Sequence, residues 1–129
     1  IPMKEFAQMK KDRDILVRII VKKVPTHTVY LSQRNSATDF PVLTCAVGLE
    51  EKKVRIVIGA RPQKAMLIEK ELESSFKFKV EEIEALAEEV QKLVPTGSNM
   101  RASAEYRSHL VKVLTKRALA QAEGDANED

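Results

Sequence analysis

Glycine is scarce in this chain, and its scarcity excludes the commonest way of binding a nucleotide. Only four of the 129 residues are glycine, and they lie far apart at Gly48, Gly59, Gly97 and Gly124. Loops that cradle phosphate groups need clustered glycines, because the backbone must approach the phosphate closely. The sequence therefore predicts that this chain does not hold a nucleotide through its own backbone.

Residues that carry catalysis or bind metals are also few. Neither His27 nor His109 has cysteine, aspartate or glutamate at the spacing of metal ligands, so no metal site is predicted. Ser103 has no base and orienting acid beside it and is expected to cap a helix. The single cysteine, Cys45, cannot form an internal disulfide and is expected on the buried face of a strand. No catalytic residue is predicted, so a free-standing enzyme is the weakest interpretation.

Tryptophan and long apolar runs are absent, and the charge is balanced. With 22 basic and 19 acidic residues interspersed and only two tyrosines, the surface is not that of a nucleic-acid binder. No apolar stretch approaches the ~20 residues that span a bilayer. The charged residues 1–13 predict no signal peptide. We expect one soluble domain in a reducing cytoplasm.

Alternating apolar residues predict an antiparallel sheet. Residues 40–49 and 52–60 are two β-branched runs that are predicted to form a hairpin with one buried face. The second run alternates its apolar residues, Val54, Ile56 and Ile58. Residues 15–21 are rich in isoleucine and valine and predict a further strand.

Helical periodicity predicts three helices after the hairpin. A short helix is expected over residues 64–73 and a longer one over 81–93, which has acidic side chains in its first turn. The last helix is predicted to begin at Ser103 as its N-cap. It is expected to bury Tyr106, Leu110, Val113, Leu114 and Ala118. The predicted fold class is α+β, a small antiparallel sheet of about three strands with three helices packed on one face.

Three segments carry a resemblance to a known family. A turn rich in glycine, serine and asparagine leads into an Arg- and Tyr-rich helix over residues 96–110. Residues 34–41 lead into an apolar strand, and residues 54–62 end in Gly-Ala-Arg-Pro. In this order they resemble the C-terminal domain of the FAD-binding (medium) subunit of molybdenum hydroxylases, the xanthine dehydrogenase and carbon monoxide dehydrogenase flavoprotein family.

The resemblance implies a domain organisation. Residues 1–26 are expected to be the end of the preceding FAD-binding domain and a connector, and residues 27–122 the C-terminal domain of the subunit. This domain would have the fold of the CO dehydrogenase flavoprotein C-terminal domain. Residues 123–129 are acidic and nearly free of apolar side chains, so they are expected to be a disordered tail.

The resemblance also implies a function. Similar proteins are oxidoreductase subunits, the FAD-dependent part of a molybdopterin dehydrogenase, and pass electrons from iron–sulfur clusters to FAD and an external acceptor. The expected partners are the FAD-binding domain of the same subunit and the subunits that carry 2Fe-2S clusters and molybdopterin. This chain would close over FAD, which the absent N-terminal domain mainly binds, and would not be catalytically active alone.

The loop over residues 30–39 is the expected cofactor-binding segment. Tyr30, Arg34 and Asp39 fall where similar proteins commonly have an aromatic, a basic residue and an acid near the isoalloxazine. An aromatic ring can cover a flavin face, and a cation with its carboxylate can tune the charge of the reduced flavin. The chain departs from the family at Leu31 and Ser32, where a lysine is frequent. The alternative interpretation is an ordinary polar loop in which Asp39 caps a turn.

Arg101, Tyr106 and Arg107 are the expected contacts with the flavin-binding domain. Arginine fixes planar hydrogen-bond partners, and tyrosine joins an apolar body to a polar tip, so the trio suits an interface between domains. In the alternative interpretation Tyr106 belongs to the core and both arginines lie on a solvated helix face.

An alternative function follows from the basic last helix. Its basic residues are Arg107, Lys112, Lys116 and Arg117. In this interpretation the chain is a small interaction module that binds an acidic partner or nucleic acid. The chain is also expected to self-associate, because the apolar residues 15–21 would lack their neighbouring domain.

Overall fold

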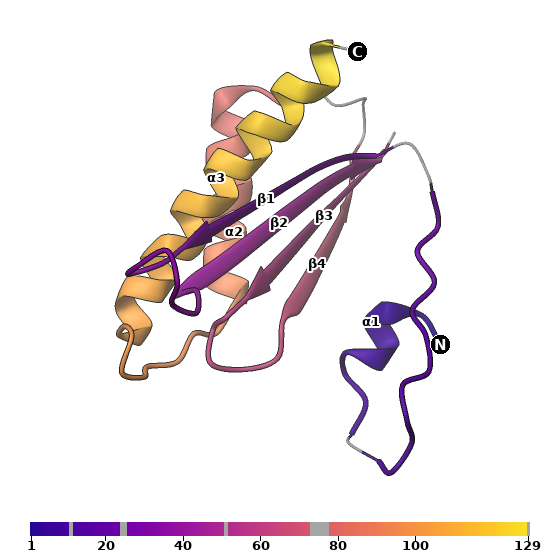
Figure 1. Ribbon diagram of the computed structural model, residues 1–129. Helices are drawn as coiled ribbons and strands as arrows, with labels where there is room; N and C mark the ends of the chain where they lie inside the picture. The colour runs from indigo at the N-terminus through magenta and orange to yellow at the C-terminus, as the bar shows by residue number, and fades with distance from the viewer. Residues whose placement is uncertain (11, 24–25, 51, 73–77, 129) are drawn as a thin grey trace.

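The chain forms one antiparallel sheet with two long helices on one of its faces (Figure 1). The computed structural model describes residues 1–10, 12–23, 26–50, 52–72 and 78–128. The strands follow one another in the sheet in chain order: β1 (His27–Gln33), β2 (Leu43–Glu50), β3 (Lys53–Gly59) and β4 (Met66–Glu71). The helices are α1 (Met3–Phe6), α2 (Val80–Leu93) and α3 (Ala104–Glu128). The predicted α+β class with a small antiparallel sheet is confirmed.

The core lies between the sheet and the two long helices. Along β3 the residues Val54, Ile56 and Ile58 are buried and alternate with half-exposed positions, as the period of two predicts. Cys45 on β2 is fully buried as expected, and burial raises the pKa of its thiol to about 11. α3 contacts β1 and β2, and α2 packs beside α3. The helix α2 buries one stripe: Ile83, Leu86, Ala87 and Val90.

The prediction of a helix over residues 64–73 is wrong. The chain forms β4 there, and its apolar residues Met66 and Ile68 pair with Ile58 and Ile56 of β3. Pairing with an exposed strand edge outweighs the weak helical spacing of this segment, because it satisfies a whole row of backbone groups. The sheet therefore has four strands. Residue 73 lies outside the described residues.

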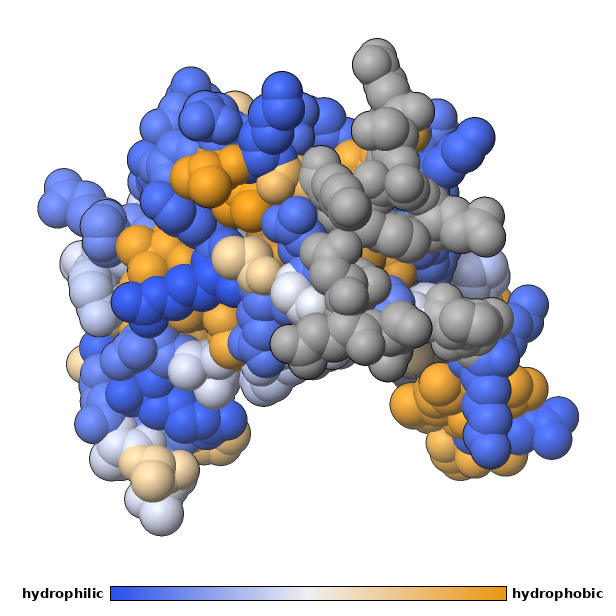
Figure 2. Space-filling model, turned by 90° about the horizontal axis from the view of Figure 1, so that it is seen from above, coloured by the Kyte–Doolittle hydropathy of each residue, from blue (hydrophilic) through white to orange (hydrophobic). Residues whose placement is uncertain are grey.

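The strand predicted over residues 15–21 is also wrong. The structure assigns this segment to neither a helix nor a strand, and all its side chains are exposed. β-branched composition alone does not make a strand, because the backbone groups need a neighbouring strand as partner. Figure 1 shows this N-terminal part beside β4, on the side of the sheet away from α3. In Figure 2 it is the group of orange atoms at the lower right, set apart from the bluer body.

The last helix begins where the sequence predicts but ends later. Ser103 is its N-cap as predicted, since its Oγ accepts the N–H of Tyr106 at 3.2 Å. α3 continues through Glu128, where a disordered tail was expected, and residue 129 lies outside the described residues. Adding residues to an established helix costs little, which allows this continuation past Ala122. No helix in the described ranges is both long enough and apolar enough to span a bilayer.

The sheet and α2 cover only part of the apolar side of α3. Leu110, Leu114 and Ala118 are buried as predicted. Tyr106 is 44% exposed and Val113 is half-buried, so the prediction that both are core residues is wrong for the single chain. One side of α3 therefore keeps apolar surface that the rest of the domain does not cover.

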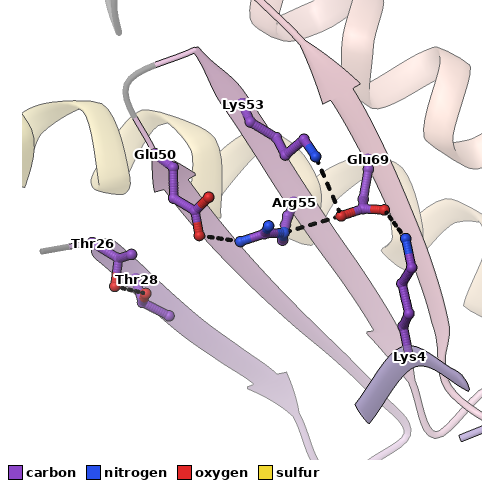
Figure 3. A network of polar contacts seen from close by, with 7 residues as sticks. All are labelled: Lys4, Thr26, Thr28, Glu50, Lys53, Arg55 and Glu69. Atoms are coloured by element: carbon purple, nitrogen blue, oxygen red, sulfur yellow. Dashed lines mark hydrogen bonds and ion pairs between the residues drawn. The ribbon is translucent and has the colours of Figure 1, made fainter. Parts of the chain in front are cut away.

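The face of the sheet opposite the long helices carries an ion-pair network (Figure 3). Arg55 lies between Glu50 and Glu69, and its Nε is 3.0 Å from Glu69 Oε1. Lys4 of α1 also binds Glu69, with Nζ and Oε2 2.9 Å apart. Lys4 and then Arg55 lower the pKa of Glu69 to about 2. This network joins the N-terminal segment to β4.

Candidate functional site

Three loops that carry the family resemblance meet at one end of the sheet. They are residues 34–42 after β1, residues 60–65 after β3 and residues 94–103 before α3, and together we call them the loop end. Figure 1 shows them gathered at the lower end of the sheet. Segments far apart in sequence thus form one structural unit, and two buried arginines hold it together.

Arg107 lies inside the loop end and is fully buried. Its guanidinium donates to the carbonyl oxygens of Val42, Gly97 and Ala102 at 2.9, 2.8 and 2.6 Å. Its Nη2 also donates to Asn99 Oδ1 at 2.6 Å. None of these acceptors is charged, and burial lowers the pKa of Arg107. One side chain of α3 therefore fixes the start of β2 and the whole turn before the helix.

Arg61 holds the loop end from the opposite side. It is 9% exposed, and its Nη1 donates to the carbonyl of Pro95 at 2.7 Å. Its Nε donates to the carbonyl of Lys64 at 2.8 Å, and its own carbonyl accepts the N–H of Gly97 at 3.1 Å. The Gly-Ala-Arg-Pro segment thus serves to connect the end of β3 with the turn before α3.

The outer side of the loop end is built around Asp39. Arg101 donates to Asp39 Oδ1 through Nε and Nη2, both at 3.0 Å, and lies over the ring of Phe40 at 5.2 Å from its centroid. Arg34 donates to the carbonyl oxygen of Asp39. The Arg101 guanidinium first, and the N–H of Phe40 second, lower the pKa of Asp39. The carboxylate is therefore held charged mainly by Arg101, while Arg34 binds the main-chain carbonyl of the same residue.

The structure brings together some of the residues predicted for the site and separates others. Arg34 and Asp39 from the expected cofactor loop contact each other, and Arg101 from the expected interface joins them. Asp39 Oδ1 also accepts the N–H of Phe40 at 2.7 Å, a local bond that the alternative interpretation of an ordinary polar loop also allows. Tyr30 lies on the outer face of β1 and is 59% exposed. The predicted set is thus split between the loop end and the sheet.

The other two predicted interface residues differ in position. Arg107 has no exposed surface to offer to a neighbouring domain, because its hydrogen bonds are made inside this one. Tyr106 is partly exposed, so it is not a core residue. Neither the interface interpretation nor the solvated-face interpretation describes Arg107. The reason is that three loops deliver enough acceptors to bury a guanidinium.

Sequence reasoning missed three residues of the loop end. From the sequence, Arg61 is expected only to lie in the segment that ends a strand, Asn99 in a turn, and Phe40 at the start of a strand. Phe40 is 73% exposed and forms the aromatic surface beneath Arg101. The sequence signal for Phe40 is an aromatic residue between Asp39 and a proline, outside the alternating strand pattern. Arg61 and Asn99 have no such sequence signal, because their hydrogen-bond partners are distant in sequence.

The outer side of the loop end combines exposed aromatic surface with charged side chains. Exposed aromatic surface at Phe40, with Arg34 and the Asp39–Arg101 pair beside it, suits a planar heteroaromatic group that gains negative charge. Among the described residues, the glycines lie singly in two strands, a turn and a helix. No group of three or more metal-ligating side chains is found in that part of the chain.

The basic surface that the alternative function needs is largely used within the domain. Lys112 binds Glu84 and Glu88 of α2, each at 2.8 Å, and Lys116 also binds Glu84. Lys112 first, and Lys116 second, lower the pKa of Glu84 to about 2. Since Arg107 is buried, these ion pairs argue against α3 as a surface for nucleic acid or an acidic partner.

Solved structures that share this fold include two enzymes. Quinoline 2-oxidoreductase from Pseudomonas putida 86 is 19% identical with a TM-score of 0.64, and the match covers 78% of this chain and 38% of that chain. Carbon monoxide dehydrogenase from Hydrogenophaga pseudoflava, in a form that lacks the Mo-pyranopterin moiety of the molybdenum cofactor, is 20% identical with a TM-score of 0.65. That match covers 75% of this chain and 36% of the other. Among curated proteins, none matches this chain.

The family assignment rests on the sequence from β1 through most of α3. The family described as CO dehydrogenase flavoprotein C-terminal domain matches residues 28–122, which include all the loops of the loop end. The resemblance carried by residues 34–41, 54–62 and 96–110 is therefore confirmed. The chain belongs to the CO dehydrogenase flavoprotein C-terminal domain family, the C-terminal domain of the FAD-binding subunit of molybdenum hydroxylases.

Proposed function

We propose that this chain closes over FAD in a xanthine dehydrogenase-like molybdenum hydroxylase, with the outer side of the loop end next to the isoalloxazine ring. The observation that carries the proposal is the contact of Asp39 with Arg101 and Arg34 beside the exposed ring of Phe40. In this role the domain supports electron transfer and does not carry out the hydroxylation. FAD, when bound, supplies a carrier between the iron–sulfur clusters and an external acceptor.

The side chains of this domain would act on the flavin by position and charge. The exposed ring of Tyr30 is available to cover one flavin face. Arg34 and Arg101 supply positive charge that favours an anionic flavin ring, and Asp39 limits that effect by neutralising part of it. Arg107 and Arg61 hold the loops in place without touching the cofactor.

The N-terminal segment belongs, in this proposal, to the preceding FAD-binding domain and its connector. Residues 12–23 lie outside the sheet with their side chains exposed, including Ile15, Val17, Ile20 and Val21. Such a segment needs a covering neighbour, and a flavin-binding domain that holds the pyrophosphate would supply it. The further partners would be the iron–sulfur and molybdopterin subunits, in the cytoplasm.

The test uses the complete enzyme. Arg34→Ala and Asp39→Ala should each slow flavin reoxidation or shift the flavin potential, because both change the charge beside the ring. Reduction of the molybdenum centre by substrate should stay within twofold, since that centre is separate along the electron path. Stopped-flow absorbance resolves both steps.

Arg117→Ala serves as the matched control, because Arg117 is an exposed arginine of the same domain away from the loop end. Unaltered flavin kinetics in both loop variants would refute the proposal. A thermal melt of each variant separates a kinetic effect from unfolding, since an exposed loop substitution usually changes stability by less than about 0.5 kcal/mol.

A further inference from the structure

The backbone of β1 is open on one side. The carbonyl of Gln33 accepts the N–H of Val42 at 2.7 Å, so Gln33 turns its backbone groups toward β2. Backbone groups alternate in direction along a strand, which leaves Thr28, Tyr30 and Ser32 directed to the free edge. Within the described ranges, no backbone hydrogen bond from another segment reaches these three residues. β1 therefore offers a row of unpaired donors and acceptors.

The two edges of the sheet differ in how they are protected. β4, the other edge strand, carries Glu69, Lys70 and Glu71, and Lys4 of α1 binds Glu69 beside it. Charged side chains of this kind discourage pairing with another strand. β1 has the sequence His-Thr-Val-Tyr-Leu-Ser-Gln and contains no aspartate, glutamate, lysine, arginine or proline. Only the β4 edge is guarded against strand addition.

The sequence of β1 is complementary to itself. If two copies pair antiparallel with Tyr30 opposite Tyr30, Thr28 lies opposite Ser32, and Val29 lies opposite Leu31. Hydroxyl side chains then meet on the outer face of the sheet, and aliphatic side chains meet on the core face. No like charges oppose each other. This register extends both the backbone ladder and the apolar layer across the two-fold axis.

The uncovered side of α3 supports the same arrangement. α3 contacts both β1 and β2, while Lys112 and Lys116 reach from it to α2. Tyr106 and Val113 are seven residues apart on one side of the helix, and neither is buried in the single chain. With strands ~4.8 Å apart, two copies of α3 would stand about 10 Å apart, the distance of packed helices.

We infer that β1 and the adjoining side of α3 form a two-fold interface with a second copy of this chain. Two sheets join into one continuous antiparallel sheet, and the exposed rings of Tyr30 and Tyr106 are covered at the junction. The interface is distinct from the N-terminal residues 15–21, from which self-association was expected. It concerns the chain without its flavin-binding neighbour, and its test does not depend on flavin.

Sedimentation equilibrium of the full chain should give twice the monomer mass of 14.5 kDa at micromolar concentration. The double variant Thr28→Lys/Ser32→Lys places lysine opposite lysine at both outer pairs and should weaken the dimer at least tenfold. The double variant Thr28→Lys/Ser32→Glu places lysine opposite glutamate at the same pairs and should restore it. Glu71→Lys adds a positive charge at the other edge and should leave the dimer unchanged.

The charge pairs make the register testable, since only the pairing of Thr28 with Ser32 predicts opposite behaviour for the two double variants. A monomeric chain at high micromolar concentration would overturn the inference. Dissociation by Val17→Asp, with the two-lysine variant still dimeric, would also overturn it and assign self-association to residues 15–21. Far-UV circular dichroism melts check that each variant is folded.

Discussion

Arg107 and Arg101 belong to the same signature segment, six residues apart, yet they lie on opposite sides of the loop end. Arg107 is fully buried, and it donates to neutral oxygens of the loops around it. Arg101 is partly exposed and binds the carboxylate of Asp39. Both sides use a guanidinium, but the inner one organises backbone and the outer one presents charge.

The difference shows which part of a family signature is structural. The inner side connects Val42, Gly97, Asn99 and Ala102, so it determines whether the loop end forms at all. The outer side can be altered without exposing any buried acceptor. Substitutions on the inner side should therefore act on folding, and those on the outer side should act on charge.

The largest expected effect comes from Arg107→Ala. The change leaves several buried oxygens without a donor, and each unsatisfied group costs about 1–3 kcal/mol. We expect the free energy of unfolding to fall by about 3 kcal/mol or more, measured by urea denaturation. Arg107→Lys should recover part of this loss, because an ammonium group keeps the charge but cannot reproduce the planar fork.

Arg117→Ala is the matched control, since Arg117 is an exposed arginine on the same helix. Its effect should stay within about 0.5 kcal/mol. If Arg107→Ala were equally mild, the loop end would be held by other contacts, and the comparison between its two sides would lose its basis.

Local patterns predicted the centre of the fold but not its periphery. The alternation of Val54, Ile56 and Ile58 identified β3, and the helix α2 followed from its apolar stripe. The helical spacing of Ala65, Ile68 and Leu72 predicts a helix where β4 lies, and only pairing with β3 makes the segment a strand. Residues 15–21 have strand composition but pair with no strand in the part of the chain that the structure describes. Pairing is a long-range property that a local window does not contain.

The candidate site was predicted as two separate groups, and the structure joins them. Asp39 came from the expected cofactor loop and Arg101 from the expected interface, and their contact spans 62 positions in the sequence. The burial of Arg107 had no signal either, because its acceptors come from segments that meet only in the folded chain. Residue types were therefore predictable, but their division into inner and outer sides was not.

A smaller effect is expected from Asn99→Asp, which tests whether the buried Arg107 lacks a counter-charge. Asn99 Oδ1 accepts both Arg107 Nη2 at 2.6 Å and the N–H of Arg101 at 2.9 Å. Asn99→Asp would make these bonds charge-assisted and give Arg107 a counter-charge. The free energy of unfolding should therefore rise by up to about 1 kcal/mol at pH 7. The gain should be lost progressively as pH falls from about 4 through the lower pKa that Arg107 gives the new carboxyl group in the folded chain.

Gln121→Glu adds the same negative charge to an exposed position of α3 and serves as the control for a general effect of net charge. Equal changes in the two variants would mean that the buried guanidinium has no need of a counter-charge. Thermal and urea unfolding at pH 7 and pH 3 distinguish these results.

The smallest expected effect is on the outer side, where Arg101→Ala should change a pKa more than it changes stability. Arg101 is the largest cause of the lowered pKa of Asp39, so that pKa should rise in the variant, as followed by carboxyl carbon NMR shifts. Part of the depression should remain, because the N–H of Phe40 still donates to the carboxylate at 2.7 Å. A carboxyl whose folded pKa is depressed stabilises the protein above its unfolded pKa and loses that contribution as pH falls through the folded value. Arg101→Ala should therefore lower the melting temperature slightly at pH 7, where the ion pair is present, and should leave it unchanged at low pH, where Asp39 is protonated in both proteins. An unchanged Asp39 pKa would show that the ion pair does not persist in solution, and the outer side would then present two independent arginines to a flavin.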